Sequence, residues 1–219
     1  MPRAGEVQAP EKWAACATVA AISAAFIGAG ITAETGIMSL SPPATDAHPN
    51  PAPDVRTPLI LHQAAFTAWA ALALAIPAFV AFPLRRVSDS AARIWRPFWT
   101  AAYIAFLVHM LWSMGAFFGW DFDWMRNTPR VSAFWPGIAV LFWWPMDLIL
   151  AWRGHGAAWV EIQRAILTAV LFVLFVGGST VTGELWPVRG LGLILFGAMI
   201  AAMLIRIRAR RARIERSGP

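Results

Sequence analysis

The sequence predicts an all-α integral membrane protein, a bundle of six transmembrane helices with both termini in the cytoplasm. Two features of the composition predict this class: 58% of the 219 residues are hydrophobic, and only 14% are charged. Soluble domains carry about 25% charged residues. A third feature, the concentration of basic residues in alternate segments between apolar runs, predicts the orientation.

The first predicted span covers residues 13–33 and follows a polar N-terminal segment, residues 1–12. A cleaved signal peptide is the alternative, because Arg3 and Lys12 precede the apolar run. The apolar region of a signal peptide is about 7–15 residues long, and this run is longer. We therefore expect a retained helix, and its many small residues favour close packing against a neighbouring helix.

The other five apolar runs each have about the 20 residues that a bilayer-spanning helix needs. With the first run they are expected to form one transmembrane domain, residues 13–207, without an intervening linker. A proline-rich loop, residues 34–58, is expected in the periplasm, and a basic tail, residues 208–219, in the cytoplasm. The five runs cover residues 59–83, 97–119, 133–152, 159–178 and 187–207.

Basic residues mark one side of the predicted bundle. With the N-terminus inside, 14 of the 18 Lys and Arg residues fall in cytoplasmic segments and 4 in outer loops, as the positive-inside rule requires. Among the 18 basic residues only Lys12 is lysine, which indicates a GC-rich bacterial gene and hence the bacterial inner membrane. We expect the arginine tail to contact anionic lipid headgroups and not nucleic acid.

Tryptophans are expected at both membrane interfaces, where an aromatic belt usually lies. Nine of the thirteen fall near predicted span ends: Trp13, Trp95, Trp99, Trp120, Trp124, Trp135, Trp152, Trp159 and Trp186.

Several kinds of chemistry are excluded. Cys16 is the only cysteine, which rules out an intramolecular disulfide, a CxxC redox pair and a cysteine-rich metal site. The sequence has no GxSxG, HExxH, Walker A or GxGxxG motif, so no enzyme class is indicated.

His109 is the histidine predicted to lie deepest in the membrane, near the middle of the span 97–119. Trp112 lies three residues further along on the same helical face, and Tyr103 is close to that face. We expect the group to bind a cofactor, with His109 as a haem b ligand, a hydrogen-bonding partner of a quinone or a proton relay. The alternative is a structural hydrogen bond between helices.

A second group of polar residues is predicted at the outer ends of the helices. His62 lies in the first turns of the second span, Glu34 follows the first span, and Asp121 and Asp123 follow the third. Together with His109 these residues are our candidates for general acid/base catalysis. A carboxylate–histidine group can also hold a metal ion, but we assign none. The alternative is that they are solvated helix ends.

A haem bound by both His62 and His109 is disfavoured by depth. At 1.5 Å per residue, His62 lies roughly 5–8 Å below the outer boundary and His109 roughly 15 Å below it. Axial ligands of one iron should lie at the same level. A shift of a few residues in the span boundaries would remove the mismatch, so His62 stays a candidate cofactor ligand beside His109.

Asp147 lies near the inner end of the fourth span, just after Pro145. We expect it to form an ion pair with an arginine: Arg96, Arg153 or Arg164. Pro145 has no N–H, so it also leaves the carbonyl of Leu141 without its helical partner.

Three functions remain open. The first is that the protein binds or acts on an apolar small molecule, a lipid, isoprenoid or quinone, near the periplasmic ends of the second and third spans. The second is a haem b or quinone-binding subunit of a redox complex. The third is a non-catalytic accessory or transport subunit of a membrane complex.

Overall fold

The computed structural model describes residues 8–32, 57–127, 134–154, 156–181 and 186–216. All regular structure in these ranges is helical. The six long helices are α1 (Gln8–Ile31), α2 (Thr57–Leu84), α3 (Asp89–Leu111), α5 (Phe134–Trp152), α6 (Ala158–Val176) and α7 (Trp186–Arg216). A short helix, α4 (Phe122–Asn127), follows α3, and two π-helical turns, η1 (Trp112–Phe117) and η2 (Gly177–Val181), extend α3 and α6.

The six long helices are apolar and long enough to cross a membrane. This confirms the all-α class and gives six candidate spans in the described part of the chain. Large apolar side chains cover the outside of the bundle; Phe142 is 68% exposed and Val173 66%. Such a surface suits contact with lipid, whose tails are as apolar as leucine. Which end faces the cytoplasm remains a prediction.

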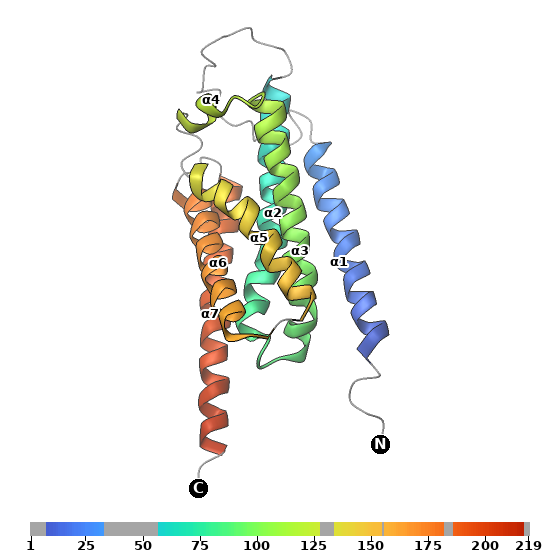
Figure 1. Ribbon diagram of the computed structural model, residues 1–219, viewed down its shortest axis with the longest axis vertical. Helices are drawn as coiled ribbons and strands as arrows, with labels where there is room; N and C mark the ends of the chain where they lie inside the picture. Colours follow the sequence, from blue (N-terminus) through green and yellow to red (C-terminus); the bar gives the residue numbers. More distant parts are fainter. Residues whose placement is uncertain (1–7, 33–56, 128–133, 155, 182–185, 217–219) are drawn as a thin grey trace.

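The central helix of the bundle is α2, which packs along α3 and also contacts α1, α6 and α7. Helix α1 lies at the edge, and α5 packs on α3 and α6 (Figure 1). The beginning of α1, the end of α7 and the α2–α3 turn lie at the same end of the molecule, whereas α4 lies at the other (Figure 1). We call these the basic end, after the arginines of the turn and of α7, and the α4 end.

Helix α3 begins at Asp89, earlier than the apolar pattern predicted. Ser88 caps it: the Ser88 side chain accepts a hydrogen bond from the backbone N–H of Ala91, at 3.3 Å. Asp89 in the first turn complements the positive end of the helix dipole. The polar turn 85–88 is therefore short, and residues 89–96 belong to the helix.

Two tryptophans that the sequence placed in the interfacial belt lie inside the bundle instead. Trp95 is 3% exposed and Trp99 is fully buried. The Trp99 ring packs between Phe79 of α2 and Trp144 of α5, with ring centroids 5.8 and 4.7 Å away. The belt assignment was wrong for both, because distance along the chain from a span end does not reveal which face of α3 meets α2 and α5.

Helices α1 and α2 approach closely at a glycine. A Cβ atom placed on Gly30 would lie 3.1 Å from Cγ2 of Thr67, which is itself buried. This contact agrees with the role expected for small residues in the first span.

Candidate functional site

His109 bridges α3 and α2. Its Nδ1 lies 3.0 Å from the carbonyl oxygen of Ala64. A carbonyl can only accept, so we assign the ring proton to Nδ1, which donates this bond. Thr67 Oγ1 and Ser113 Oγ lie further away, at 3.5 and 3.4 Å from Nδ1. One nitrogen of His109 thus has a structural role, and Nε2 has no hydrogen-bond partner among the described residues.

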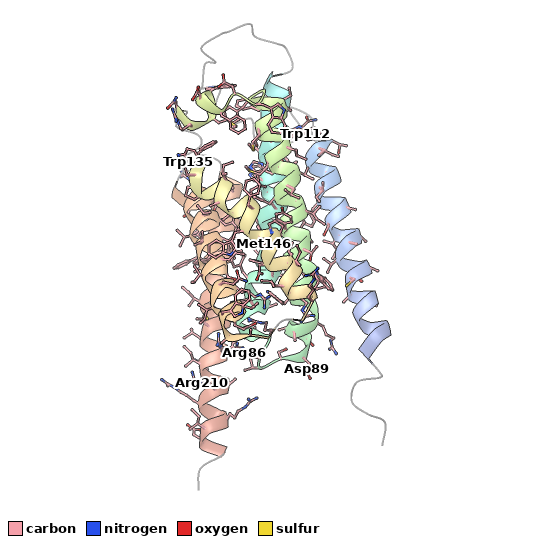
Figure 2. All side chains as sticks on the ribbon, in the orientation of Figure 1. Arg86, Asp89, Trp112, Trp135, Met146 and Arg210 are labelled. Atoms are coloured by element: carbon pink, nitrogen blue, oxygen red, sulfur yellow. The ribbon has the colours of Figure 1, made fainter. Side chains whose placement is uncertain are left out.

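Trp112 and Gln63 connect three helices beside this histidine. The indole Nε1 of Trp112 donates to Oε1 of Gln63 at 3.1 Å. The amide nitrogen of Gln63 then donates to the carbonyl oxygen of Ile31, at 2.9 Å, near the end of α1. Figure 2 shows Trp112 at the α4 end of the bundle. The polar atom of Trp112 is therefore engaged within the protein.

Tyr103 has a structural partner as well. Its hydroxyl donates to the carbonyl oxygen of Leu141 in α5, at 3.3 Å. This is the carbonyl that Pro145, four residues later in the helix, leaves without an N–H partner. Tyr103 thus satisfies a backbone group inside the membrane, where water cannot.

The predicted outer carboxylates lie apart from His109. Asp121 Oδ1 accepts a hydrogen bond from the backbone N–H of Trp124, at 2.8 Å, at the start of α4. Asp123 pairs with Arg126 over 3.6 Å, and both side chains are exposed. Within the described ranges no hydrogen bond or ion pair joins either aspartate to His109. Glu34 and the side chain of His62 lie outside the described residues.

The densest group of charges lies at the basic end, and we call it the arginine–carboxylate cluster. Its residues come from the turn after α2, from α5, from the first turns of α6 and from α7: Arg85, Arg86, Asp147, Glu161, Arg164 and Arg206.

Asp147 is the buried carboxylate of the cluster, with no exposed surface. Its Oδ1 accepts from Nε of Arg164 at 2.9 Å and from Nε2 of Gln163 at 2.6 Å. Its Oδ2 accepts from the indole N–H of Trp99, at 2.9 Å. The predicted ion pair is confirmed, with Arg164 as the partner. Three donors compensate the cost of burying this charge.

Glu161 joins this buried pair to the α2–α3 turn. Its Oε1 accepts from Nη1 of Arg164 at 2.9 Å, and its Oε2 accepts from Nη2 of Arg86 at 2.8 Å and from Nη2 of Arg85. Arg85 also lies over the ring of Phe82, 3.9 Å from Cζ to the centroid. Burial is the main cause that lowers the pKa of Arg85 to about 10. The guanidinium therefore still carries its charge at neutral pH.

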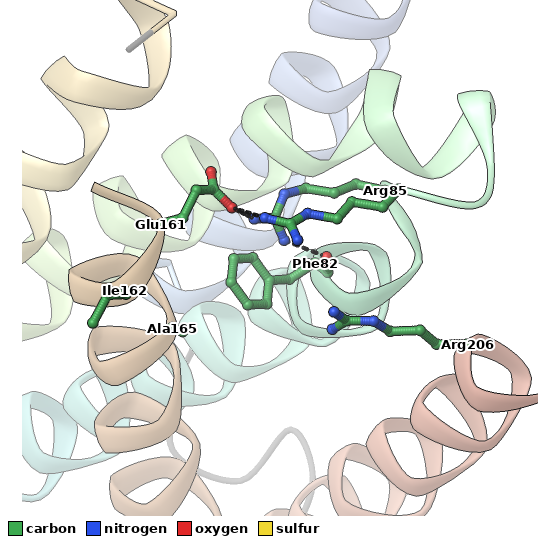
Figure 3. A pocket seen from close by; sticks show the side chains of 7 residues that line it. Phe82, Arg85, Glu161, Ile162, Ala165 and Arg206 are labelled. Carbon is green, nitrogen blue, oxygen red and sulfur yellow. Dashed lines mark hydrogen bonds and ion pairs between the residues drawn. The ribbon is translucent and has the colours of Figure 1, made fainter. Parts of the chain in front are cut away.

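A pocket of about 250 Å³ opens beside Arg85 and Glu161. Arg206 reaches toward it from α7, while Arg85 and Glu161 meet on its other side (Figure 3). The lining combines three guanidinium groups and one carboxylate with apolar side chains, from Phe82, Arg85, Arg86, Glu161, Ile162, Ala165 and Arg206.

Sequence reasoning missed Glu161 as the centre of this cluster and used Arg85 and Arg86 only to orient the helices. A signal was available. Glu161 is the acidic residue in the first turn of an apolar helix, and the predicted topology places it on the same side as Arg85 and Arg86. An isolated carboxylate at a membrane boundary facing a basic loop predicts an ion pair.

Comparison of the chain with protein-family models, with curated proteins and with solved structures found no match. The fold alone defines the class: a multi-pass helical membrane protein with an arginine-lined pocket at one end of its bundle.

Proposed function

We propose that the protein binds an amphiphile with an anionic, phosphate-bearing headgroup, a lipid or an isoprenoid, in the pocket at the basic end. The observation that carries this proposal is the lining of the pocket, where Arg85, Arg86 and Arg206 meet apolar side chains at the end of membrane-spanning helices. This keeps the small-molecule class predicted from the sequence, and moves the site to the opposite end of the bundle.

The chemistry of the lining supports an anionic ligand. A guanidinium offers a planar fork of donors that matches the oxygens of a phosphate. Ile162, which is 62% exposed and lines the pocket, lies on an outward-facing surface of α6. A headgroup bound to the arginines would leave its hydrocarbon chain along that apolar surface.

Charge along α7 favours the same ligand. Beyond Arg206, α7 carries Arg208, Arg210, Arg211, Arg213 and Arg216, and Figure 2 shows Arg210 on the part of α7 that extends past the other helices. Each arginine near an anionic leaflet contributes about 1 kcal/mol of attraction. We place this end in the cytoplasm of a bacterium, with the protein in the inner membrane, so the ligand would come from the inner leaflet.

The proposal is tested by native mass spectrometry of the purified protein with added phosphatidylglycerol or phosphatidylcholine. We expect retention of the anionic lipid, and a loss of about tenfold in affinity for Arg206→Gln, the size of one charge-assisted hydrogen bond. Arg210→Gln is the matched control, one helical turn further along α7 and outside the pocket lining. Equal losses in both variants, or equal retention of the two lipids, would overturn the proposed site.

A second candidate is favoured by His109, whose Nε2 accepts no hydrogen bond from the part of the chain that the structure describes. It is a site for an apolar small molecule, a quinone or haem b, at the α4 end, where a π-helical turn follows α3 directly; such turns are frequent at functional sites. Asp121 and Asp123 would then lie at its mouth.

The absorbance spectrum of the purified protein, oxidised and then reduced, tests this candidate. A Soret band that disappears in His109→Ala supports haem, and a quinone in the lipid extract of the wild type alone supports quinone binding. A colourless protein whose lipid extract contains no quinone would contradict both haem and quinone binding. Co-purification in a stoichiometric complex would then favour the third possibility, an accessory subunit.

A further inference from the structure

We infer that the pocket at the basic end selects a doubly charged phosphate monoester over a singly charged phosphodiester. This rests on the proposed function and names the headgroup class of its ligand. It follows from the balance of charges and hydrogen-bonding groups in the arginine–carboxylate cluster.

The cluster contains two more positive than negative charges. Its four guanidinium groups are opposed by only two carboxylates, Asp147 and Glu161. Arg85 and Arg164 are 13% and 4% exposed, so water screens their charges only weakly, whereas Arg86 is 59% exposed and is screened more strongly. A ligand with two negative charges would neutralise it, and one with a single charge would leave it half neutralised.

The two carboxylates of the cluster already accept several hydrogen bonds from protein side chains. Each accepts three side-chain hydrogen bonds, Asp147 from Trp99, Gln163 and Arg164, and Glu161 from Arg85, Arg86 and Arg164. Arg206 has no ion pair with either of them in the described part of the chain. Arg206 can therefore offer its donors to a ligand in the pocket without breaking one of these ion pairs.

Donors also exceed acceptors in the buried part of the cluster. Nη2 of Arg164 and Nε1 of Trp95 are buried and lack an acceptor among the described residues. Both residues lie close to Arg85. The Cζ atoms of Arg164 and Arg85 lie 5.1 and 5.2 Å from the centroid of the Trp95 ring. A buried donor without a partner is unfavourable, so the protein around the pocket has an excess of donors, although neither of these two residues lines the pocket itself.

A phosphate monoester supplies what is missing. It carries about −1.5 to −2 charges at pH 7 and presents three acceptor oxygens, and its second pKa is about 6. A phosphodiester carries a single charge and has two free oxygens. At pH 5 the monoester is also mostly singly charged, so the predicted preference depends on pH in a way that arginines alone would not produce.

The test is a competition between phosphatidic acid and phosphatidylglycerol with the same acyl chains, measured by native mass spectrometry of the full-length protein. At pH 7.5 we expect phosphatidic acid to bind about tenfold more tightly, the size of one additional charge-assisted hydrogen bond. At pH 5 the ratio should fall toward one. Arg206→Gln should reduce the ratio at pH 7.5 more than Arg210→Gln does, because Arg206 lines the pocket and Arg210 does not.

Each outcome decides a different claim. Equal binding of the two anionic lipids at both pH values would overturn the monoester preference and leave the proposed function standing. Binding of neither lipid would overturn the proposed function itself. Displacement of phosphatidic acid by inorganic phosphate at equal concentration would retain the dianion preference and overturn the lipid as its source.

Discussion

Arg164 and Asp147 form an ion pair inside the bundle, with Nε of Arg164 donating to Oδ1 of Asp147 over 2.9 Å. Arg164 is 4% exposed and Asp147 is fully buried. Asp147 also accepts a hydrogen bond from Trp99 of α3. Arg164 also donates to Glu161, which binds the arginines that follow α2. One buried contact therefore connects four helices to the lining of the pocket.

Removing one partner of this pair should be costly. We expect Asp147→Ala to lower the free energy of unfolding by about 3 kcal/mol, the lower end of the cost of breaking a buried pair, because it leaves the Arg164 guanidinium buried with only Glu161 as a counter-charge. Tryptophan fluorescence during unfolding in mixed detergent micelles measures the change. The double variant D147L/R164M should recover much of the loss, since it removes both charges. A double variant less stable than D147A would contradict this account.

Trp99 and Trp144 form a matched pair for measuring the indole hydrogen bond. Both are fully buried, but Trp99 Nε1 donates to Asp147, whereas Trp144 Nε1 has no partner among the described residues. We expect Trp99→Phe to destabilise the protein by about 1.5–3 kcal/mol more than Trp144→Phe, the value of a hydrogen bond to a charged group. The same unfolding experiment measures both variants. Equal losses would show that the bond contributes nothing beyond packing.

The bond from Tyr103 to Leu141 should matter only while Pro145 is present. Tyr103→Phe leaves the Leu141 carbonyl unsatisfied, and we expect a loss of about 1 kcal/mol. In a Pro145→Ala background the helix can supply an N–H to the same carbonyl. A double-mutant cycle should therefore give a smaller loss for Y103F in that background. Additive losses would refute this role of the hydroxyl.

Labelling of single cysteines tests the predicted orientation. After Cys16→Ser, a cysteine is introduced at Asp123, at the α4 end with its side chain 87% exposed, or at Arg210, which is exposed on α7. A membrane-impermeant maleimide should label D123C in intact spheroplasts and R210C only after the membrane is broken. The reverse pattern would invert the bundle and place the arginine pocket outside.

Much of the local structure was predictable, because its causes lie within short stretches of chain. Pro145 cannot donate a backbone hydrogen bond, so the freed carbonyl of Leu141 was expected before its partner was known. Asp147 needed a cation nearby, and Arg164 was one of three candidates. Which arginine it would be depended on the rotation of α6 against α5, which residue spacing within each helix does not specify.

The candidate site was less predictable. His109, Trp112 and Tyr103 were selected because polar atoms are expensive in a membrane, and the structure gives each of them a partner within the protein. Whether His109 also binds a ligand remains a prediction. The same physical rule, applied to Glu161, leads to the arginine–carboxylate cluster.

The sequence by itself determined the membrane class, the six long helices and the presence of buried charges that need partners. These follow from length, apolarity and charge, which act locally. Only the tertiary structure decided that Trp95 and Trp99 face the core and that Glu161 binds three arginines. It also decided that Arg206 of α7 lines the same pocket as Arg85 and Arg86, which follow α2. The reason is that helix packing selects which faces meet, and that choice depends on all the helices together.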